Sequence, residues 1–328
     1  MKNNKNINKL IKTKQYILIY KYKYIKLKKF RYSVKHIYSF IIISFLIISF
    51  ILEKKHKIID FDYFACFGGV ARKENLYIRD LISYYLQLGF EKFILVDNNY
   101  PNVEKLSDVL NDYINNNTVD IIEFYGSSIP QCNLYEIIYE KYKTKCTWIS
   151  FFDLDEYLTM RSEDKRQIKI REYLSNPIFK KCESISINWL IYTDNNLLFY
   201  ENRSVVERFT SPNYKTSENR VVKSIVRGNL NKIVFYPFTQ HHVPDKRLHI
   251  CNSLGKIIRR YNRLNVKIPL LKYTYLMHYS TKTAEEYINK LKRGEYGNRE
   301  YNIIDRISKF FEYNKTFNKI RYQTNKHN

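Results

Sequence analysis

Apolar and polar residues follow a repeating pattern along the first half of the globular part of the chain. Four short apolar runs, rich in β-branched and aromatic residues and bounded by polar turns, predict buried strands. These runs cover residues 63–70, 93–96, 119–124 and 148–152. Three segments between them carry apolar side chains at helical spacing. These segments cover residues 76–88, 103–114 and 134–143. The resulting βαβαβαβ order predicts an α/β fold with a mostly parallel sheet flanked by helices on both faces.

The pattern is less regular beyond residue 160. Helices are expected at residues 162–174 and 283–293, the second beginning with a capping-box pattern formed by Thr283 and Glu286. Further strands are expected at residues 184–191, 221–226, 233–235 and 273–277, with one or two more between 197 and 209. We therefore place one globular domain at residues 63–294, followed by a basic C-terminal helix and tail at 295–328.

The N-terminal segment differs from the rest in charge and hydropathy. The net charge of the chain is +24, and residues 1–57 contribute +14 of it, with 15 Lys and Arg against Glu53. The uncharged run at 37–52 would span about 24 Å as a helix, short of a hydrocarbon core of about 30 Å. A buried core helix is the alternative, but the run has no polar face and follows a basic block. We expect a cytosolic tail at 1–36, an uncleaved transmembrane signal anchor at 37–52 and a short stem at 53–62.

Charge also bears on location and partners. Because positive residues stay on the cytosolic side, the body of a single-pass type II protein would be lumenal, as in the Golgi or endoplasmic reticulum. The alternative is the cytoplasmic face of a membrane, with residues 37–52 as a tether. The membrane anchor explains the basic tail, so no nucleic-acid partner is needed to explain it. A nucleic-acid-binding protein would carry basic and aromatic residues on one face of its folded domain.

The five cysteines show no metal-like spacing. Their odd number does not indicate a closed disulfide framework, and we expect most of them to be buried free thiols. One disulfide, Cys132–Cys146, stays possible if the protein lies in an oxidising compartment.

The segment 148–160 carries the main candidate chemistry, because its apolar strand ends in Asp153, Asp155 and Glu156. Residues two apart on a strand lie on the same face, and ligands of open α/β sheets bind at the carboxyl ends of the strands. Two carboxylates there suit Mn²⁺ or Mg²⁺ carrying a substrate phosphate. A lone D-x-D is a weak signal, so a strand that runs into an acidic turn is the structural alternative.

Other polar residues follow predicted strands. His278 follows the run at 273–277, where a neutral imidazole could complete the coordination of Mn²⁺; a hydrogen-bonded core histidine is the alternative. The loops at 72–75 and 97–99 should lie at the same sheet edge as the D-x-D and could bind a nucleotide, with Arg72 on a phosphate. Ordinary loop polarity is the alternative there.

Several blocks, in order, resemble GT-A-type glycosyltransferases of the family 2-like and family 92 group. The resemblance covers about residues 64–294, and it includes Trp-Ile-Ser-Phe-Phe-Asp-Leu-Asp-Glu-Tyr-Leu at 148–158 and His278-Tyr-Ser-Thr-Lys282. The other blocks lie at residues 71–79, 88–99, 187–189, 206–209 and 223–227. The resemblance implies a GT-A-like fold, a UDP-sugar or similar nucleotide-sugar donor, Mn²⁺ (or Mg²⁺) on its diphosphate, and inverting transfer to a glycan, glycoprotein or polysaccharide hydroxyl.

The resemblance also assigns residues. Asp153 and Asp155 take the metal positions, and His278 takes the downstream metal-ligand position. The residues expected at the donor site are Arg72, Glu74, Asn75, Asp97, Asp153, Trp189 and Lys223.

A carboxylate must take the proton of the acceptor hydroxyl, and two are candidates. Glu207, in Val-Glu-Arg-Phe, is slightly favoured over Asp194, in Tyr-Thr-Asp-Asn. The structural alternatives are a Glu207–Arg208 ion pair and a turn role for Asp194. A catalytically inactive scaffold of the same fold and another metal enzyme, such as a nucleotidyltransferase or phosphohydrolase, are the competing function classes.

Overall fold

The computed structural model describes residues 60–100, 102–125, 129–230, 248–258, 266–293 and 303–314. Several expected segments lie outside the described residues: the cytosolic tail at 1–36, the anchor at 37–52, most of the stem and the strand at 233–235. Within the described ranges, no helix is long and apolar enough to cross a membrane.

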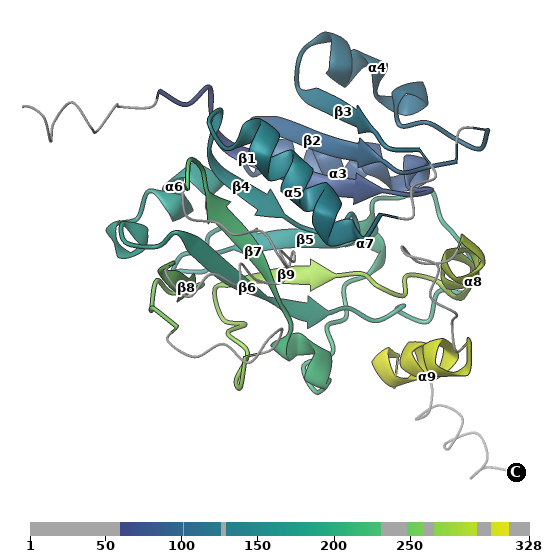
Figure 1. Cartoon of the computed structure of the whole chain (residues 1–328). Coiled ribbons are helices and arrows are strands. Elements are labelled where there is room, and N and C mark those ends of the chain that lie inside the picture. The colour runs from purple at the N-terminus through teal and green to yellow at the C-terminus, as the bar shows by residue number, and fades with distance from the viewer. Residues whose placement is uncertain are drawn as a thin grey trace, which may run out of the picture. The chain divides into compact units, whose positions relative to one another are not determined.

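The described strands form one nine-stranded sheet in the order β3-β2-β1-β4-β7-β6-β9-β5, with β8 paired to β6 (Figure 1). The strands are β1 (Tyr63–Ala71), β2 (Lys92–Asp97), β3 (Val119–Glu123), β4 (Cys146–Phe151), β5 (Glu156–Met160), β6 (Ser184–Ile191), β7 (Val222–Arg227), β8 (Ile250–Asn252) and β9 (Thr274–His278). The helices are α3 (Asn75–Gln87), α4 (Ser107–Asn115), α5 (Gln131–Tyr142), α6 (Ile170–Leu174), α7 (Val205–Arg208), α8 (Ala284–Arg293) and α9 (Ile303–Tyr313). Two short 3₁₀ helices cover Pro177–Phe179 and Ser217–Arg220.

The first half of the sheet has the parallel β/α arrangement that the sequence predicts. Strands β3, β2, β1 and β4 all run parallel, and successive side chains of β1 enter different cores. Phe67 packs in the cluster that holds the buried side of α3, whereas Cys66 packs in the cluster that holds α5. Figure 1 shows these two helices on opposite faces of the parallel strands. This half places the carboxyl ends of four strands at one edge.

The second half of the sheet mixes directions. Strand β7 is antiparallel to β4 and to β6, while β9 is parallel to β6 and antiparallel to β5. Strand β5, which is not among the strands predicted from the sequence, begins after residues 152–155 and pairs with β9 instead of β4. The chain therefore turns sharply where the acidic residues lie.

Two predicted elements beyond residue 160 are wrong. Only Ile170–Leu174 of the expected helix 162–174 is α-helical, because the Ser162 hydroxyl donates to the Arg166 carbonyl and closes a turn with an Arg161–Gln167 bridge. The expected strands between 197 and 209 are replaced by a loop and the short helix α7, whose N-cap Ser204 accepts a hydrogen bond from the Glu207 amide.

The prediction of free thiols is also wrong. Cys66 and Cys146 form a disulfide between the neighbouring strands β1 and β4, with Cα atoms 6.1 Å apart. A second disulfide joins Cys182, just before β6, to Cys251 on β8. Cys132 is the remaining free thiol, so the bridge left open between Cys132 and Cys146 does not form. Each bridge joins cysteines that only the sheet order brings together.

Candidate functional site

The turn between β4 and β5 sends the two aspartates of the D-x-D in different directions. Both lie in this turn and not on a strand, because the Glu156 amide donates to the Asp153 carbonyl and a Glu156 carboxylate oxygen accepts from the Asp153 amide. The expectation that they share one face of a strand is therefore wrong. Asp153 faces residues of β7 and α5, and Asp155 faces residues of β9 and α8.

Asp155 lies beside His278. The antiparallel register of β5 and β9 pairs Glu156 with His278, and the Tyr279 amide donates to the Asp155 carbonyl. His278 Nε2 lies 3.5 Å from Asp155 Oδ1, and Lys290 Nζ lies 2.8 Å from Asp155 Oδ2. Burial alone would raise the pKa of Asp155, but the Lys290 ammonium and the neighbouring His278 outweigh it and hold that pKa well below its usual range. Asp155 is therefore a buried anion.

Asp153 is held by a buried lysine. Lys223, on β7, has a fully buried side chain whose Nζ lies 2.6 Å from Asp153 Oδ2 and 3.3 Å from Glu156 Oε1. Gln131 and Tyr135, both on α5, donate hydrogen bonds to Asp153 Oδ1 at 3.0 and 3.2 Å. One protein cation thus compensates two carboxylates, and this leaves Asp155 and His278 to face the other way.

The pKa of Glu156 is shifted in the direction opposite to that of Asp155. Burial raises its pKa well above the usual range, and the charges of Asp153 and Asp155 add to the effect, while Lys223 only partly offsets it.

Asp155, Glu156 and His278 could hold a metal ion. Each offers one ligand atom, and these atoms all lie within 4.8 Å of one another. Oxygen and imidazole donors together suit Mn²⁺, Fe²⁺ or Zn²⁺ better than Mg²⁺, which prefers oxygen alone. The structure therefore brings Asp155 and His278 together, as the sequence predicts, but places Glu156 beside them where Asp153 was expected.

Trp189 and Lys223, both expected at the donor site, lie against the same cluster. The Trp189 ring, on β6, packs on the His278 ring with centroids 4.2 Å apart, and Lys223 Nζ lies 5.6 Å from the Trp189 ring. His278 Nδ1 is buried and has no hydrogen-bond partner among the described residues, so the Trp189 ring and the Asp155 carboxylate near Nε2 are the contacts that orient this imidazole.

The loops after β1 and β2 pack on each other. Asp97 is fully buried, accepts from the backbone amides of Asn99 and Leu106, and so shapes the loop after β2. The Arg72 guanidinium donates to the Tyr100 hydroxyl at 2.8 Å and lies over that ring. Asn75 donates to the Lys105 carbonyl, and Glu74 is buried next to it. These residues share the sheet edge that the sequence predicts, with Arg72 and Tyr100 on its surface.

The two candidate bases differ in exposure. Glu207 is exposed on α7, and the Arg208 guanidinium next to it binds Glu286 with two hydrogen bonds of 2.8 and 3.0 Å. The alternative of a Glu207–Arg208 pair is therefore wrong. Asp194 is buried, its carboxylate accepts from the Asn196 amide within its own turn, and burial raises its pKa.

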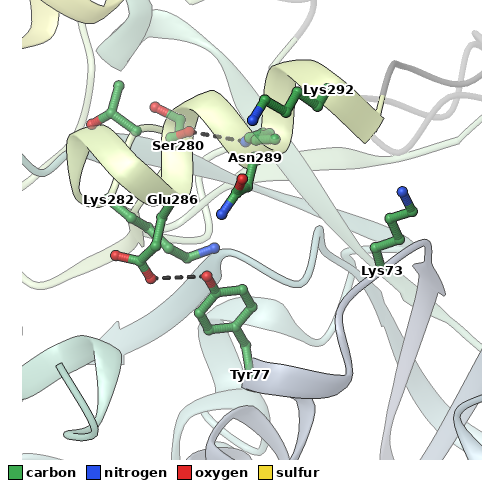
Figure 2. Close-up of a pocket in the computed structure, with 9 residues that line it drawn as sticks. Lys73, Tyr77, Ser280, Lys282, Glu286, Asn289 and Lys292 are labelled. Atoms are coloured by element: carbon green, nitrogen blue, oxygen red, sulfur yellow. Dashed lines mark hydrogen bonds between the residues drawn. The ribbon is translucent and has the colours of Figure 1, made fainter. Parts of the chain in front are cut away.

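A basic cavity of about 340 Å³ adjoins Asp155 (Figure 2). Its lining comprises Lys73, Tyr77, Ser280, Thr281, Lys282, Glu286, Asn289, Lys290 and Lys292. In Figure 2, Lys73 and Tyr77 come from the β1–α3 side, and the other labelled residues come from α8 and the loop before it. The sequence marks Lys282, within its His-Tyr-x-x-Lys block, Lys73 and Tyr77, within the block at 71–79, and Glu286, within the capping-box pattern. The other lysines carry no signal in so lysine-rich a chain.

Comparison with known proteins agrees with the resemblance in the sequence. None of the curated proteins matches the chain. The solved structures that resemble it include TarS of S. aureus, at 14% identity and a TM-score of 0.35 over 77% of this chain and 44% of TarS. TarS residues 1–349 give a TM-score of 0.30 at 13% identity over 50% of this chain and 47% of that one. The same fragment in complex with UDP gives 0.28 at 14% identity over 43% and 38%.

The chain thus covers less than half the length of each TarS structure. The family model described as glycosyltransferase family 92, in contrast, matches residues 62–327, which is most of the chain. This protein belongs to glycosyltransferase family 92.

Proposed function

We propose that this protein is a cation-dependent glycosyltransferase that moves a sugar from a UDP-sugar to a hydroxyl of a glycan or polysaccharide, with inversion. The observation that carries the proposal is the pairing of Asp155 with His278 next to a lysine-lined cavity, in a chain of a glycosyltransferase family. A cation site and a polyanion site side by side suit a donor whose leaving group is a nucleoside diphosphate.

The cation would be held by Asp155 and His278, with Glu156 as the third ligand. When bound, it would supply positive charge against the diphosphate that leaves the sugar. The imidazole ligand makes Mn²⁺ the better fit than Mg²⁺. We assign Asp153 to positioning: it holds Lys223 against Glu156 and so fixes the turn that carries Asp155.

The protein's own groups account for proton transfer and donor orientation. We assign Glu207 as the base, because it is exposed to an incoming hydroxyl and its neighbour Arg208 is anchored to Glu286 on the cavity wall. The acceptor oxygen forms a bond to the anomeric carbon as its proton passes to Glu207. The bond from that carbon to the diphosphate breaks on the opposite face, which inverts the configuration. Asp194 instead shapes its own turn.

We place the nucleotide at the loops after β1 and β2. Arg72 and Tyr100 form a cationic and aromatic pair there, which can stack on a base or meet a phosphate. Asp97 holds the loop that carries Tyr100.

The two disulfides support the lumenal side as the location. Disulfides persist in secretory and extracellular compartments and are rare in the reducing cytosol. We therefore propose a type II orientation with the anchor at 37–52 and the described domain in an oxidising compartment.

The test is donor turnover by the purified full chain. UDP- and GDP-sugars are incubated singly with Mn²⁺ or EDTA, and the released nucleoside diphosphate is measured. One donor is expected to turn over with Mn²⁺ only, and Asp155→Asn should lower the rate by at least about 100-fold. Asp62→Asn, an exposed aspartate before β1, is the control and should match the wild type. Turnover that persists in EDTA would contradict the cation dependence. Folded protein that binds no nucleotide sugar would contradict the enzyme and favour the inactive scaffold.

A further inference from the structure

The cavity of Figure 2 concentrates positive charge. Four lysines from three segments line it: Lys73 after β1, Lys282 before α8, and Lys290 and Lys292 on α8. Within this lining Glu286 is ion-paired with the buried Arg208, and Lys290 is ion-paired with Asp155. A cavity lined by several lysine side chains suits a small polyanion.

Two of these lysines lie on unusual backbone. Lys73 has φ of 54° and Lys282 has φ of 53°, in the left-handed region that residues other than glycine rarely adopt. The Lys282 ammonium lies 4.0 Å from the centre of the Tyr77 ring, and Tyr77 donates a hydrogen bond to Glu286. The backbone conformation at both positions and the Tyr77 contact fix where these two lysine side chains start at the cavity.

Lys290 belongs to both the cavity and the cation cluster. Its Nζ donates to Asp155 Oδ2 at 2.8 Å and to the Ser280 carbonyl at 2.9 Å. A divalent cation on Asp155 would repel this ammonium and compete for the same carboxylate. The Lys290 side chain is one-third exposed, and its long stem allows the ammonium to turn towards the cavity.

We propose that the lysine-lined cavity binds the diphosphate of the donor, and that Lys290 couples this site to the cation site by leaving Asp155 when the cation binds. This inference rests on the proposed function, since that function supplies both the cation and the diphosphate. Without the cation, the Lys290 ammonium supplies the positive charge next to Asp155. With the cation bound, Lys290 joins Lys73, Lys282 and Lys292 around the diphosphate. Each ligand therefore tightens the binding of the other.

Replacement of Lys290 must then act in opposite directions on the two ligands. Binding of MnCl₂ alone, and of UDP in the presence of Mn²⁺, is measured by calorimetry on the full chain. Lys290→Met should bind Mn²⁺ about tenfold more tightly, because the competing ammonium is gone, and UDP about tenfold more weakly. Lys292→Met leaves Asp155 untouched and should weaken UDP alone. Lys180→Met, an exposed lysine elsewhere, should bind both like the wild type.

Two further arms identify the ligand. UMP lacks the second phosphate, so Lys290→Met should weaken UMP binding less than UDP binding. Inorganic pyrophosphate should displace UDP. Simultaneous binding of pyrophosphate and UDP would show that the cavity takes another anion, such as an anionic acceptor, and would overturn the assignment.

The outcomes separate this inference from the proposed function. If the wild type binds Mn²⁺ and UDP but Lys290→Met has unchanged or weaker Mn²⁺ affinity, the coupling is wrong and the proposed function stands. If the folded wild type binds neither ligand, both fail. Thermal unfolding of each variant checks its fold, and Lys292→Met tests the cavity even if Lys290→Met does not fold.

Discussion

His278 Nε2 lies 3.5 Å from Asp155 Oδ1, although one residue ends β9 and the other precedes β5. The antiparallel pairing of these strands creates the contact, and Trp189 from β6 packs on the imidazole. Three strands of the mixed half of the sheet thus build the proposed cation site.

Cation binding at this contact should stabilise the fold. At a free Mn²⁺ concentration of 100 times Kd, the stabilisation is about 2.7 kcal/mol, which raises the Tm of a domain of this size by roughly 5–10 °C. Thermal unfolding with MnCl₂ or EDTA measures the shift. His278→Gln should remove most of it, whereas His249→Gln, at an exposed histidine, should keep it. An undiminished shift in His278→Gln would place the cation elsewhere.

The buried Arg208–Glu286 pair should control acid stability. Burial alone would raise the pKa of Glu286, but hydrogen bonds and charge from Arg208 and the Thr283 hydrogen bond outweigh it, so this pKa lies below its usual 4.5. The ionised carboxylate therefore favours the folded state at neutral pH. This contribution is complete above the unfolded value and is lost as pH falls through the lowered pKa.

Glu286→Gln leaves Arg208 buried without its anion and should cost about 3–5 kcal/mol at neutral pH. The variant should also lose less stability than the wild type on acidification. Urea unfolding at a series of pH values measures both effects. Glu172→Gln, whose partner Arg166 is exposed, is the control and should change little. If the free energy of unfolding depends on pH equally in the wild type and in Glu286→Gln, this carboxylate does not control the loss of stability in acid.

Much of the fold follows from the sequence because its first half is local. Alternating apolar runs and amphipathic helices place β1 to β4 and their helices to within a few residues. Strand β5 is not predicted because it is short, follows the acidic turn and is defined only by its distant partner β9. Strand β8 is short, and its partner β6 lies far away in the sequence. Cysteine pairing likewise depends on which strands are neighbours.

Those pairings give a thiol prediction. Labelling of the folded, unreduced chain should modify Cys132 alone, because the other four cysteines are bridged. The double variant Cys66→Ser/Cys146→Ser should lose about 2–5 kcal/mol of unfolding free energy. Cys132→Ser should keep the wild-type value. Mass spectrometry of the labelled chain and urea unfolding give the two readouts, and labelling of Cys66 or Cys182 without reductant would contradict the pairing.

Replacement of the proposed base should slow the chemical step and leave donor binding unchanged. Glu207→Gln should lower kcat by about 10²–10⁴-fold and leave the Kd of UDP unchanged, because it removes only the proton acceptor. Asp194→Asn keeps the turn's acceptor oxygen and should retain most activity. Steady-state kinetics with the donor found above, together with UDP calorimetry, distinguish these cases. A larger kcat loss in Asp194→Asn than in Glu207→Gln would transfer the role to Asp194.

The candidate site could be predicted only in part. Asp155 and His278 stand out because each follows an apolar run and carries metal-binding chemistry. The ion pair of Asp153 with Lys223 could not be predicted, because Lys223 lies on β7, which becomes a neighbour of β4 only in the folded sheet. The same holds for Lys290, whose contact with Asp155 depends on where α8 packs.

A crystal structure of the full chain with Mn²⁺ and UDP, in which anomalous scattering locates the ion, would test the proposed cation site and its coupling to the lysine-lined cavity directly. We predict one strong peak within bonding distance of Asp155 and His278, the UDP diphosphate in the lysine-lined cavity, and Lys290 turned away from Asp155. An ion bound away from Asp155 and His278, or UDP bound with Lys290 still on Asp155, would contradict this prediction.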